Sequence, residues 1–322
     1  MKKLYKAILK DIKKHDTIII HRHTNPDGDA MGSQIGLSLI LKKNFPNKEI
    51  YVVGDTNKRV DFIGQMDEIA DEKYQNALVI ICDVAVSSMI SDDRYKLANK
   101  VWIIDHHKNT SDIEGASLII NSHAAAACEV VADMAFKLKL HVTKGAAEAL
   151  YTGLITDSGR FQYSDTTPKT LMIGACLMDI GINVQAIYDK LYVETLESKK
   201  LKATFTERMK VTDKNVAYLI NTKEDLEKYN VDFNTASRGM VNIMAGIEGI
   251  NIWCNFTYNP QNEKVICEFR SRGMSIVDIA KKYGGGGHDQ ACGATIDSFD
   301  MIPSLLADFD NRMEEYLNET NS

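Results

Sequence analysis

A histidine and two aspartates stand close together near the start of the chain, in the stretch TIIIHRHTNPDGDAMGS. His23 precedes an Asn-Pro turn, and Asp27 and Asp29 lie on either side of Gly28. Proline fixes the backbone of such a turn, and glycine lets the chain pass between two acids without crowding. One imidazole and two carboxylates at this spacing are typical ligands of a hard divalent metal ion. The same residues are also ordinary turn formers and helix caps, so further segments must supply partners.

Three further segments supply them. The apolar run ALVIICDV closes on Asp83, and VWIIDHH closes on Asp105, His106 and His107. A third segment, LITDSGRF, carries Asp157 where a helix or short strand gives way to a loop. Ligands of open α/β sheets bind at the carboxyl ends of the strands, where these side chains would meet. So many buried carboxylates would repel one another unless divalent cations neutralised them.

The ligand types indicate which metal the site takes. The set contains five carboxylates and three imidazoles but no cysteine. This composition favours manganese or magnesium over structural zinc, and the histidines favour manganese. Two ions about 3.5–4 Å apart, bridged by one carboxylate, would account for so many ligands. We therefore predict two Mn²⁺ ions, which Mg²⁺ or Co²⁺ can replace.

The elements that position these residues follow from the apolar pattern. Continuous apolar runs separated by helical segments predict strands buried on both faces, and therefore a parallel sheet. The expected strands cover residues 18–20, 50–54, 77–84 and 101–107. Helices are expected over residues 1–15, 30–43, 122–138, 144–155 and 169–178. The fold class is thus α/β, with a doubly wound parallel sheet in a catalytic metal-binding domain over residues 1–185.

A second, smaller domain follows. A stretch rich in lysine and glutamate, without glycine or proline, predicts a helical linker over residues 186–210. Alternating strand segments beyond it indicate an α+β domain over residues 211–322, with helices expected over 223–229, 237–245, 275–283 and 304–316. Its most distinctive stretch is YGGGGHDQACGA, preceded by Arg270-Ser271-Arg272. A helix end needs only one glycine, so the spare glycines indicate a ligand that approaches the backbone closely.

Composition narrows the class of protein. The net charge of −6 on 322 residues argues against a large basic surface for long nucleic acid. A short anionic substrate stays open, because bound metal ions reverse the local sign. The six cysteines are scattered without a CxxC pair, which is typical of reduced thiols in a cytosolic protein. No apolar stretch approaches the ~20 residues that span a bilayer, and we expect a soluble, cytoplasmic protein without a membrane partner.

These motifs also carry a resemblance. HTNPDGDAMGS, VIICDV, IIDHH and LITDSGRF resemble the four successive motifs of the DHH phosphoesterase superfamily, in the same order and at suitable spacing. YGGGGHDQACGA resembles the glycine-rich substrate loop of the C-terminal domain associated with it. The resemblance covers almost the whole chain, and within the superfamily the chain most resembles the stand-alone bacterial nanoRNase/pAp phosphatase proteins.

The resemblance implies a role for each residue. Ligands of one manganese would be His23 and Asp27, ligands of the other would be Asp29, His106 and Asp157, and Asp83 would bridge both. His107 would contact the scissile phosphate, and Asp105 would orient the neighbouring histidines. The residues implied in holding the far end of the nucleotide are Arg270, Arg272, Gly286, Gly287 and His288. Arg160 departs from the family pattern, in which an apolar or aromatic residue is expected; it is a candidate for an added phosphate contact, and the alternative is that it points to solvent.

The implied activity is manganese-dependent degradation of short single-stranded RNA oligonucleotides to mononucleotides, together with dephosphorylation of 3′-phosphoadenosine 5′-phosphate (pAp). No clear general acid appears; His288 and a metal-bound water are both candidates. Hydrolysis of cyclic di-AMP or of its linear product pApA is an alternative, and a nucleotide-binding regulator without turnover is an alternative of another class. Long duplex nucleic acid is not expected as a partner. The relatives also suggest a homodimer.

Other polar residues receive a structural interpretation. Glu129 and Asp133 lie within the expected alanine-rich helix, and we expect them to be solvated or to support the metal ligands. His21, which precedes the first motif, is expected to be structural.

Overall fold

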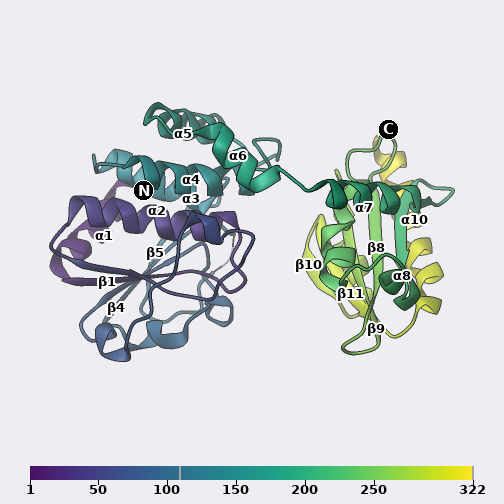
Figure 1. Ribbon diagram of the computed structural model, residues 1–322, viewed down its shortest axis with the longest axis horizontal. Coiled ribbons are helices and arrows are strands. Elements are labelled where there is room, and N and C mark those ends of the chain that lie inside the picture. Colours follow the sequence, from purple (N-terminus) through teal and green to yellow (C-terminus); the bar gives the residue numbers. More distant parts are fainter. Residues whose placement is uncertain (109, 321–322) are drawn as a thin grey trace. The chain divides into compact units, whose positions relative to one another are not determined.

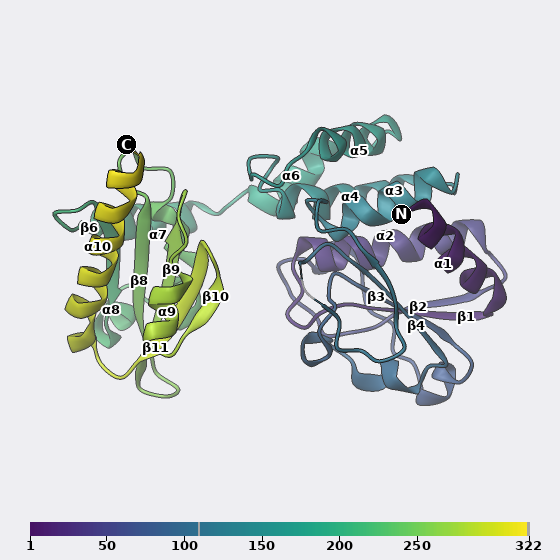
Figure 2. The ribbon, with the colours of Figure 1, turned by 180° about the vertical axis from the view of Figure 1, so that it is seen from behind.

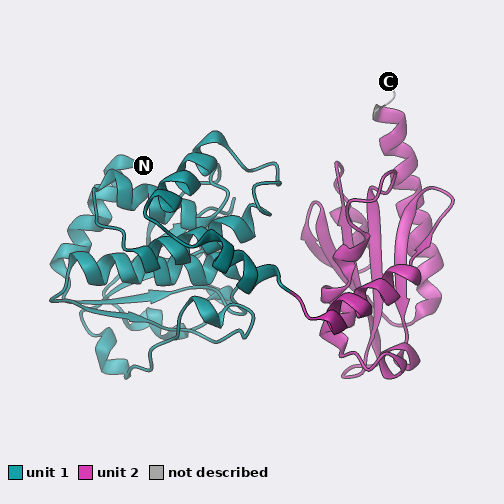
Figure 3. Ribbon diagram, turned by 45° about the horizontal axis from the view of Figure 1, so that its top comes forward, with its two compact units in different colours: residues 1–193 teal, residues 194–322 magenta. Residues whose placement is uncertain are grey.

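The computed structural model describes residues 1–108 and 110–320. The chain separates into two compact units, Met1–Val193 and Glu194–Ser322, which Figure 3 shows in different colours. Residue 109, and residues 321–322 at the end of the expected second domain, lie outside the described residues. Each unit contains one β-sheet of its own.

The segment between the units contains two helices where the sequence predicts one helical linker. α6 (Val184–Tyr192) belongs to the first unit and α7 (Leu196–Glu207) to the second. The break occurs because Thr195 is the N-cap of α7: its hydroxyl accepts a hydrogen bond from the Ser198 amide at 3.1 Å. A threonine cap can start a new helix without any glycine or proline. The lack of glycine and proline in this segment therefore did not mean that its helix was continuous.

The sheet of the first unit has five strands in the order β2-β1-β3-β4-β5, and every pairing is parallel. This confirms the predicted α/β class. The strands are β1 (Thr17–His21), β2 (Glu49–Val52), β3 (Leu78–Cys82), β4 (Lys100–Asp105) and β5 (Ser117–Ile120). The sequence does not predict β5, because four residues are too few to show a period.

Both faces of this sheet are buried. Figures 1 and 2 show the longer helices on one face; they are α1 (Lys2–Lys14), α2 (Gly28–Asn44), α3 (Ala127–Lys137), α4 (Lys144–Asp157) and α5 (Pro168–Asp179). Short 3-10 segments, among them η2 (Asp71–Tyr74) and η4 (Asp93–Leu97), contribute to the apolar core on the other face. In β1, Ile18 and Ile20 pack beneath the helices and Ile19 packs on the opposite side. The continuous apolar runs of the strands therefore have a physical cause.

Helices α2 and α4 approach each other closely through glycines. A Cβ atom on Gly32 would lie 2.5 Å from the carbonyl oxygen of Ala149, and one on Gly153 would lie 2.9 Å from the Cα of Asp29. Only glycine fits at these positions, because backbone atoms of the facing helix and the buried Cys128 sulfur occupy the space that a side chain would need. This contact brings the first turn of α2 beside the last turn of α4.

The sheet of the second unit has six strands in the order β10-β11-β9-β8-β7-β6, and only the β7–β8 pair is parallel. The strands are β6 (Lys210–Val211), β7 (Val216–Asn221), β8 (Ile252–Asn259), β9 (Lys264–Ser271), β10 (Gly286–His288) and β11 (Ala291–Ile296). One apolar core joins the sheet to α9 (Val277–Lys282) and α10 (Ile302–Thr320). Another joins it to α7 and residues 231–250, and α8 (Lys223–Lys228) follows β7.

Three local expectations differ from the structure. The helix expected over residues 122–138 begins only at Ala127, because the preceding residues form turns. The helix expected over residues 237–245 is a π-helical turn, Thr235–Gly239, followed by the 3-10 segment Val241–Met244. Part of the glycine run expected as a loop is the strand β10.

No single helix among the described residues has the length and hydropathy to cross a membrane. Within the part of the chain that the structure describes, the pair α5 and α6 meets those criteria in combination, and the two helices are bent by 114°.

The close contact between α2 and α4 leads to a stability prediction. Gly153→Ala should destabilise the protein by about 1–3 kcal/mol, because the new methyl group overpacks against Cys128 Sγ and backbone atoms of α2. The matched control is Gly145→Ala in the same helix, where the nearest atom to a Cβ is 3.6 Å away. Urea unfolding followed by circular dichroism measures both variants. Equal stability of the two would contradict the proposed packing constraint.

Candidate functional site

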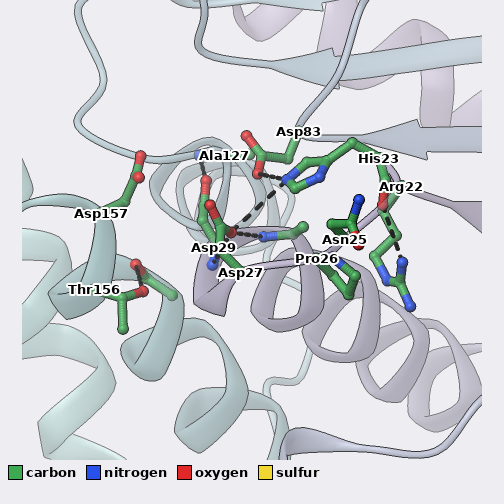
Figure 4. A network of polar contacts seen from close by, with 12 residues as sticks. Arg22, His23, Asn25, Pro26, Asp27, Asp29, Asp83, Ala127, Thr156 and Asp157 are labelled. Carbon is green, nitrogen blue, oxygen red and sulfur yellow. Dashed lines mark hydrogen bonds and ion pairs between the residues drawn. The ribbon is translucent and has the colours of Figure 1, made fainter. Parts of the chain in front are cut away.

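The carboxyl ends of β1, β3 and β4 bring the predicted acids and histidines together, with contributions from α2 and α4. Possible ligand atoms lie within 4.8 Å of one another in three overlapping groups. The groups are His23, Asp27 and Asp83; Asp29, His106 and Asp157; and Asp83, His106 and His107. All metal ligands expected from the sequence thus lie in one cluster, part of which Figure 4 shows.

Asp83 lies at the centre of this cluster. Its carboxylate lies 3.4 Å from His23 Nε2, 3.5 Å from His106 Nε2 and 3.7 Å from His107 Nδ1. The residue follows β3 with a positive φ of 59°, and its amide donates to the Ile104 carbonyl at 2.9 Å. Aspartate tolerates this left-handed conformation better than most residues, and here the conformation turns the side chain into the site.

Asp83 also provides the test of whether a metal fits. The residue is 3% exposed, and its Oδ1 makes no hydrogen bond to any described residue. A buried carboxylate oxygen without a donor is costly, and a divalent cation would satisfy it. The surrounding oxygen and imidazole ligands are those of a hard or borderline cation. The residues present therefore fit a divalent metal.

The two outer histidines are oriented by backbone carbonyl groups. His23 Nδ1 lies 2.8 Å from the Thr24 carbonyl oxygen, and His106 Nδ1 lies 3.2 Å from that of Ala124. A carbonyl oxygen only accepts, so Nδ1 carries the proton in both rings. The opposite nitrogen, Nε2, then faces the carboxylates as a metal ligand would.

Asp27 and Asp29 each bind the start of a helix. Asp27 Oδ1 accepts hydrogen bonds from the Asp29 and Ala30 amides at 2.9 and 3.0 Å and so caps α2. Asp29 accepts from the Ala127 and Cys128 amides at 2.6 and 2.9 Å. These amides begin α3, whose own N-cap, an alanine, offers no side-chain cap. A residue predicted only as a metal ligand thus also joins α2 to α3, as Figure 4 shows in part.

His107 differs from the other two histidines. Its Nδ1 lies 2.8 Å from Asp105 Oδ1, which also accepts from the His106 and His107 amides at 2.7 and 3.2 Å. Asp105 is fully buried, whereas the His107 side chain is 39% exposed. Asp105 therefore fixes the ring of His107 and leaves its Nε2 available to a ligand.

The site is electrostatically coupled. Burial favours the neutral form of Asp83, but the neighbouring imidazoles of His106 and His23 outweigh it and lower its pKa to about 2. Burial opposes the charge of His106, yet contacts with Asp157 and Asp83 raise its pKa to about 12. The pKa of His23 rises to about 9 because Asp83 likewise outweighs burial. Burial, followed by the charge of Asp83, raises the pKa of Asp29 well above its ordinary value. Imidazolium groups thus balance the acids, and bound cations would displace those protons.

Glu129 has a role that sequence reasoning identified only in part. It is 1% exposed, so the solvated interpretation is wrong; α3 and α5 bury it together. Its Oε2 accepts from the Ala125 amide at 3.1 Å and from the Thr170 hydroxyl at 2.8 Å. Glu129 thereby holds the peptide group between Ala124 and Ala125, and the Ala124 carbonyl of that peptide orients His106. Asp133 is also buried, where Tyr5 and Lys137 donate to it.

Arg22 is a buried cation that the sequence analysis did not single out. Its Nη1 donates to the His23 carbonyl at 3.0 Å and to Asp55 Oδ1 at 2.9 Å. Asp55 Oδ2 in turn accepts from the Asn25 amide at 2.8 Å. The pair therefore holds the turn after β1 from both sides, and Figure 4 shows Arg22 beside it. In the sequence, the sign of this role is that the charged Arg22 comes directly after an apolar strand.

The second unit has a pocket of about 650 Å³ beside β10 and β11. Three of the expected substrate residues line it: Arg270, Gly286 and Gly287. Arg272 and His288 are not among its lining residues; Arg272 Nε instead donates to Asn251 Oδ1 at 3.2 Å. Arg160, in the first unit, is exposed, and its guanidinium lies 5.1 Å from the centroid of the Tyr192 ring.

The glycine run has more structural duties than the sequence suggests. Gly284 has a φ of +73° and ends α9, where its amide donates to Lys281 and that of Gly285 donates to Ala280. A Cβ on Gly285 would lie 1.9 Å from the Gly293 carbonyl oxygen, and one on Gly287 would lie 2.7 Å from that of Ala291. Cβ atoms on Gly284 and Gly286 would both meet open space, but the positive φ of Gly284 would strain any side chain there. The interpretation that three glycines are spare is therefore wrong for Gly285 and Gly287.

Comparisons with known proteins agree with this arrangement. Residues 17–154 match the model of the DHH family, N-terminal domain, and residues 213–319 match that of the DHHA1 domain. A protein of Bacillus subtilis (strain 168), named bifunctional oligoribonuclease and PAP phosphatase NrnA, is 35% identical over 96% of this chain and 98% of its own length. The protein of that name from Mycoplasma pneumoniae (strain ATCC 29342 / M129 / Subtype 1) is 34% identical over 92% of this chain and 93% of its own.

A solved structure shares the fold. An exopolyphosphatase-related protein from Bacteroides fragilis aligns over 100% of this chain and 98% of its own, with a TM-score of 0.85 and 24% sequence identity. The two domain matches, the long relatives and the shared fold all agree. The chain therefore belongs to the DHH phosphoesterase family, with an N-terminal DHH domain and a C-terminal DHHA1 domain.

Proposed function

We propose that this DHH-family hydrolase uses two Mn²⁺ ions to degrade short RNA oligonucleotides to mononucleotides, and that it also dephosphorylates pAp. The observation that carries the proposal is Asp83, a buried carboxylate shared by the groups around His23 and His106. The names of the long relatives support the choice of substrates. The clustered carboxylates support a two-metal hydrolysis.

The residues that would hold the ions follow from the groups described above. One ion would be held by His23, Asp27 and Asp83, and the other by Asp29, His106, Asp157 and Asp83. When bound, the cations supply charge stabilisation for a phosphoryl group and a more acidic water molecule. The absence of thiolate ligands from these groups supports manganese over structural zinc.

His107 would act on the substrate itself. The hydrogen bond to Asp105 raises the pKa of His107, and in the protonated ring Nε2 can donate to a non-bridging phosphoryl oxygen as negative charge develops there. Because the ring is fixed before substrate binds, this donor needs no reorganisation during the reaction. Asp105 would contribute by positioning His107 and by holding the His106 amide.

The second unit would bind the nucleotide. Arg270 supplies a guanidinium to the pocket, and Gly286 leaves open space beside the backbone where a nucleotide can approach. Arg272 and Arg160 are engaged within the chain, by Asn251 and by Tyr192, and His288 does not line the pocket. The proposal for substrate binding therefore rests on Arg270 and on the glycines of β10, Gly286 and Gly287, here called the glycine strand.

Metal binding should stabilise the folded protein. We expect Mn²⁺ at about 100 times its Kd to raise the thermal unfolding midpoint by about 5 °C or more, because it neutralises the clustered acids. Differential scanning calorimetry with Mn²⁺ and with a chelator measures this shift. Asp83→Asn should abolish it, whereas Asp165→Asn, an exposed acid outside the three ligand groups, should retain it. A full shift in Asp83→Asn would contradict the assignment of Asp83.

The substrate class is tested by turnover with Mn²⁺ on a matched panel: pApA, a five-residue RNA, a long RNA, pAp, cyclic di-AMP and pyrophosphate. We expect fast release of mononucleotides from pApA and from the five-residue RNA, cleavage of pAp, and little action on long RNA. Preference for cyclic di-AMP would move the protein to turnover of that dinucleotide. Lack of turnover on every substrate would overturn the proposal in favour of a binding protein.

His107→Asn should separate catalysis from metal binding. Loss of one donor to the developing charge should lower kcat on pApA by a factor of about 10²–10³. The thermal shift produced by Mn²⁺ should remain, because His107 is not one of the proposed metal ligands. Steady-state kinetics and calorimetry on the same preparation measure both quantities. Loss of the Mn²⁺ shift in His107→Asn would make this residue a metal ligand instead.

A further inference from the structure

We infer that Arg238 joins Arg270 in recognising a terminal phosphate of the substrate, in the pocket of the second unit. This inference rests on the proposed function, whose substrates are short nucleotides. Arg238 lines the pocket together with Arg270 and the glycine strand, although it lies on a different segment of the chain. It would make the enzyme favour nucleotides that end in a phosphate group.

One acid connects the two arginines. Glu268 Oε1 accepts from Arg238 Nε at 3.3 Å, and Glu268 Oε2 accepts from Arg270 Nη2 at 3.2 Å. Glu268 is nearly buried, with its side chain 13% exposed, so it has few conformations available. Both guanidinium groups are thereby held beside the same carboxylate, on the wall of one pocket.

Arg238 nevertheless has free donors. Its side chain is 82% exposed, and neither of its Nη atoms has a hydrogen-bond partner among the described residues. An ion pair this exposed contributes little to stability, so the contact with Glu268 does not by itself account for an arginine at this position. The free face of the guanidinium has the planar geometry that binds two phosphate oxygens at once.

The backbone that carries Arg238 is fixed from beneath. Arg238 lies in the π-helical turn Thr235–Gly239. Such turns are rare in proteins, and those that occur are often found at functional sites. The buried Asn255 donates through Nδ2 to the carbonyls of Ala236 and Ser237, at 2.7 and 2.6 Å. Asn221, also fully buried, donates to Asn255 Oδ1 at 2.8 Å. Two buried amides thus satisfy carbonyl groups of the turn and hold it against the sheet.

The charge of the pocket indicates the ligand. Its charged lining residues are Arg238, Arg270 and Glu268, which sum to about +1 within a chain of net charge −6. The rest of the wall includes the four glycines of the run, which leave backbone groups accessible. A phosphodiester carries one negative charge, whereas a terminal phosphate carries about 1.5 to 2 at neutral pH. Two guanidinium groups that share one acid therefore favour the terminal phosphate.

Binding of three dinucleotides tests the inference: pApA, with a 5′-terminal phosphate, ApAp, with a 3′-terminal phosphate, and ApA, with neither. Isothermal titration calorimetry uses the full chain with His107→Asn and Mn²⁺, so that turnover is slow. We expect one phosphorylated dinucleotide to bind about tenfold more tightly than ApA, as one charged hydrogen bond allows. The dinucleotide that shows the preference identifies the end of the nucleotide that is recognised.

Adding Arg238→Ala should remove most of this preference while leaving the affinity for ApA within about twofold. Arg238→Lys should restore part of it, because the charge returns without the planar fork. The matched control is Lys264→Ala, which removes a half-exposed cation paired with Asp297 in the same unit but outside the pocket. It should keep the full preference. A preference that survives Arg238→Ala, or an equal loss for ApA, overturns the inference.

This experiment does not depend on turnover. If the enzyme hydrolyses none of the panel substrates but Arg238→Ala still removes the phosphate preference, the proposed function fails and the binding inference stands. If the panel is cleaved as expected but no preference is measured, the proposed function stands and the inference fails.

Discussion

The mutual repulsion of carboxylates at one edge of the first sheet is the constraint on which much of the first unit depends. Asp83 and Asp105 are buried there, and Asp29 lies beside them on α2. Each acid is compensated differently: Asp29 accepts two amides at the start of α3, Asp105 accepts the ring and backbone of His107, and Asp83 faces three imidazoles. The buried Asp83 oxygen that has no hydrogen-bond donor among the described residues is the group that a divalent cation would compensate.

Close packing around the cluster serves the same end. Because Gly32 and Gly153 let α2 and α4 approach, the first turn of one helix and the last turn of the other can both contribute acids to the site. Polar groups then fix the loops between these elements. Arg22 holds the turn after β1, and Glu129 holds the turn before α3. Neither side chain belongs to a ligand group, yet each determines where a histidine ligand points.

In the proposed function, the two units would divide the chemistry between them. The first would supply oxygen and imidazole ligands, together with His107 as a donor. The second supplies guanidinium groups and accessible backbone on the wall of a pocket. Its sheet also contains a buried amide pair, Asn221 and Asn255, which holds the turn that carries Arg238. A polar network inside a sheet is stable only when it is satisfied, so this one restricts the turn to a single geometry.

Local sequence patterns were enough to predict the α/β class, the strands that end in acids, and the residues that gather at the carboxyl ends of those strands. These features depend on local patterns: apolar runs, turn residues and the order of the motifs. Tertiary structure decided the rest. Four features depend on tertiary contacts. Asp29 also caps α3, and Glu129 is buried. Gly285 and Gly287 pack against β11, and Arg238 lies beside Arg270. Local periodicity carries no information about such contacts, because they exist only once the sheets and helices have packed.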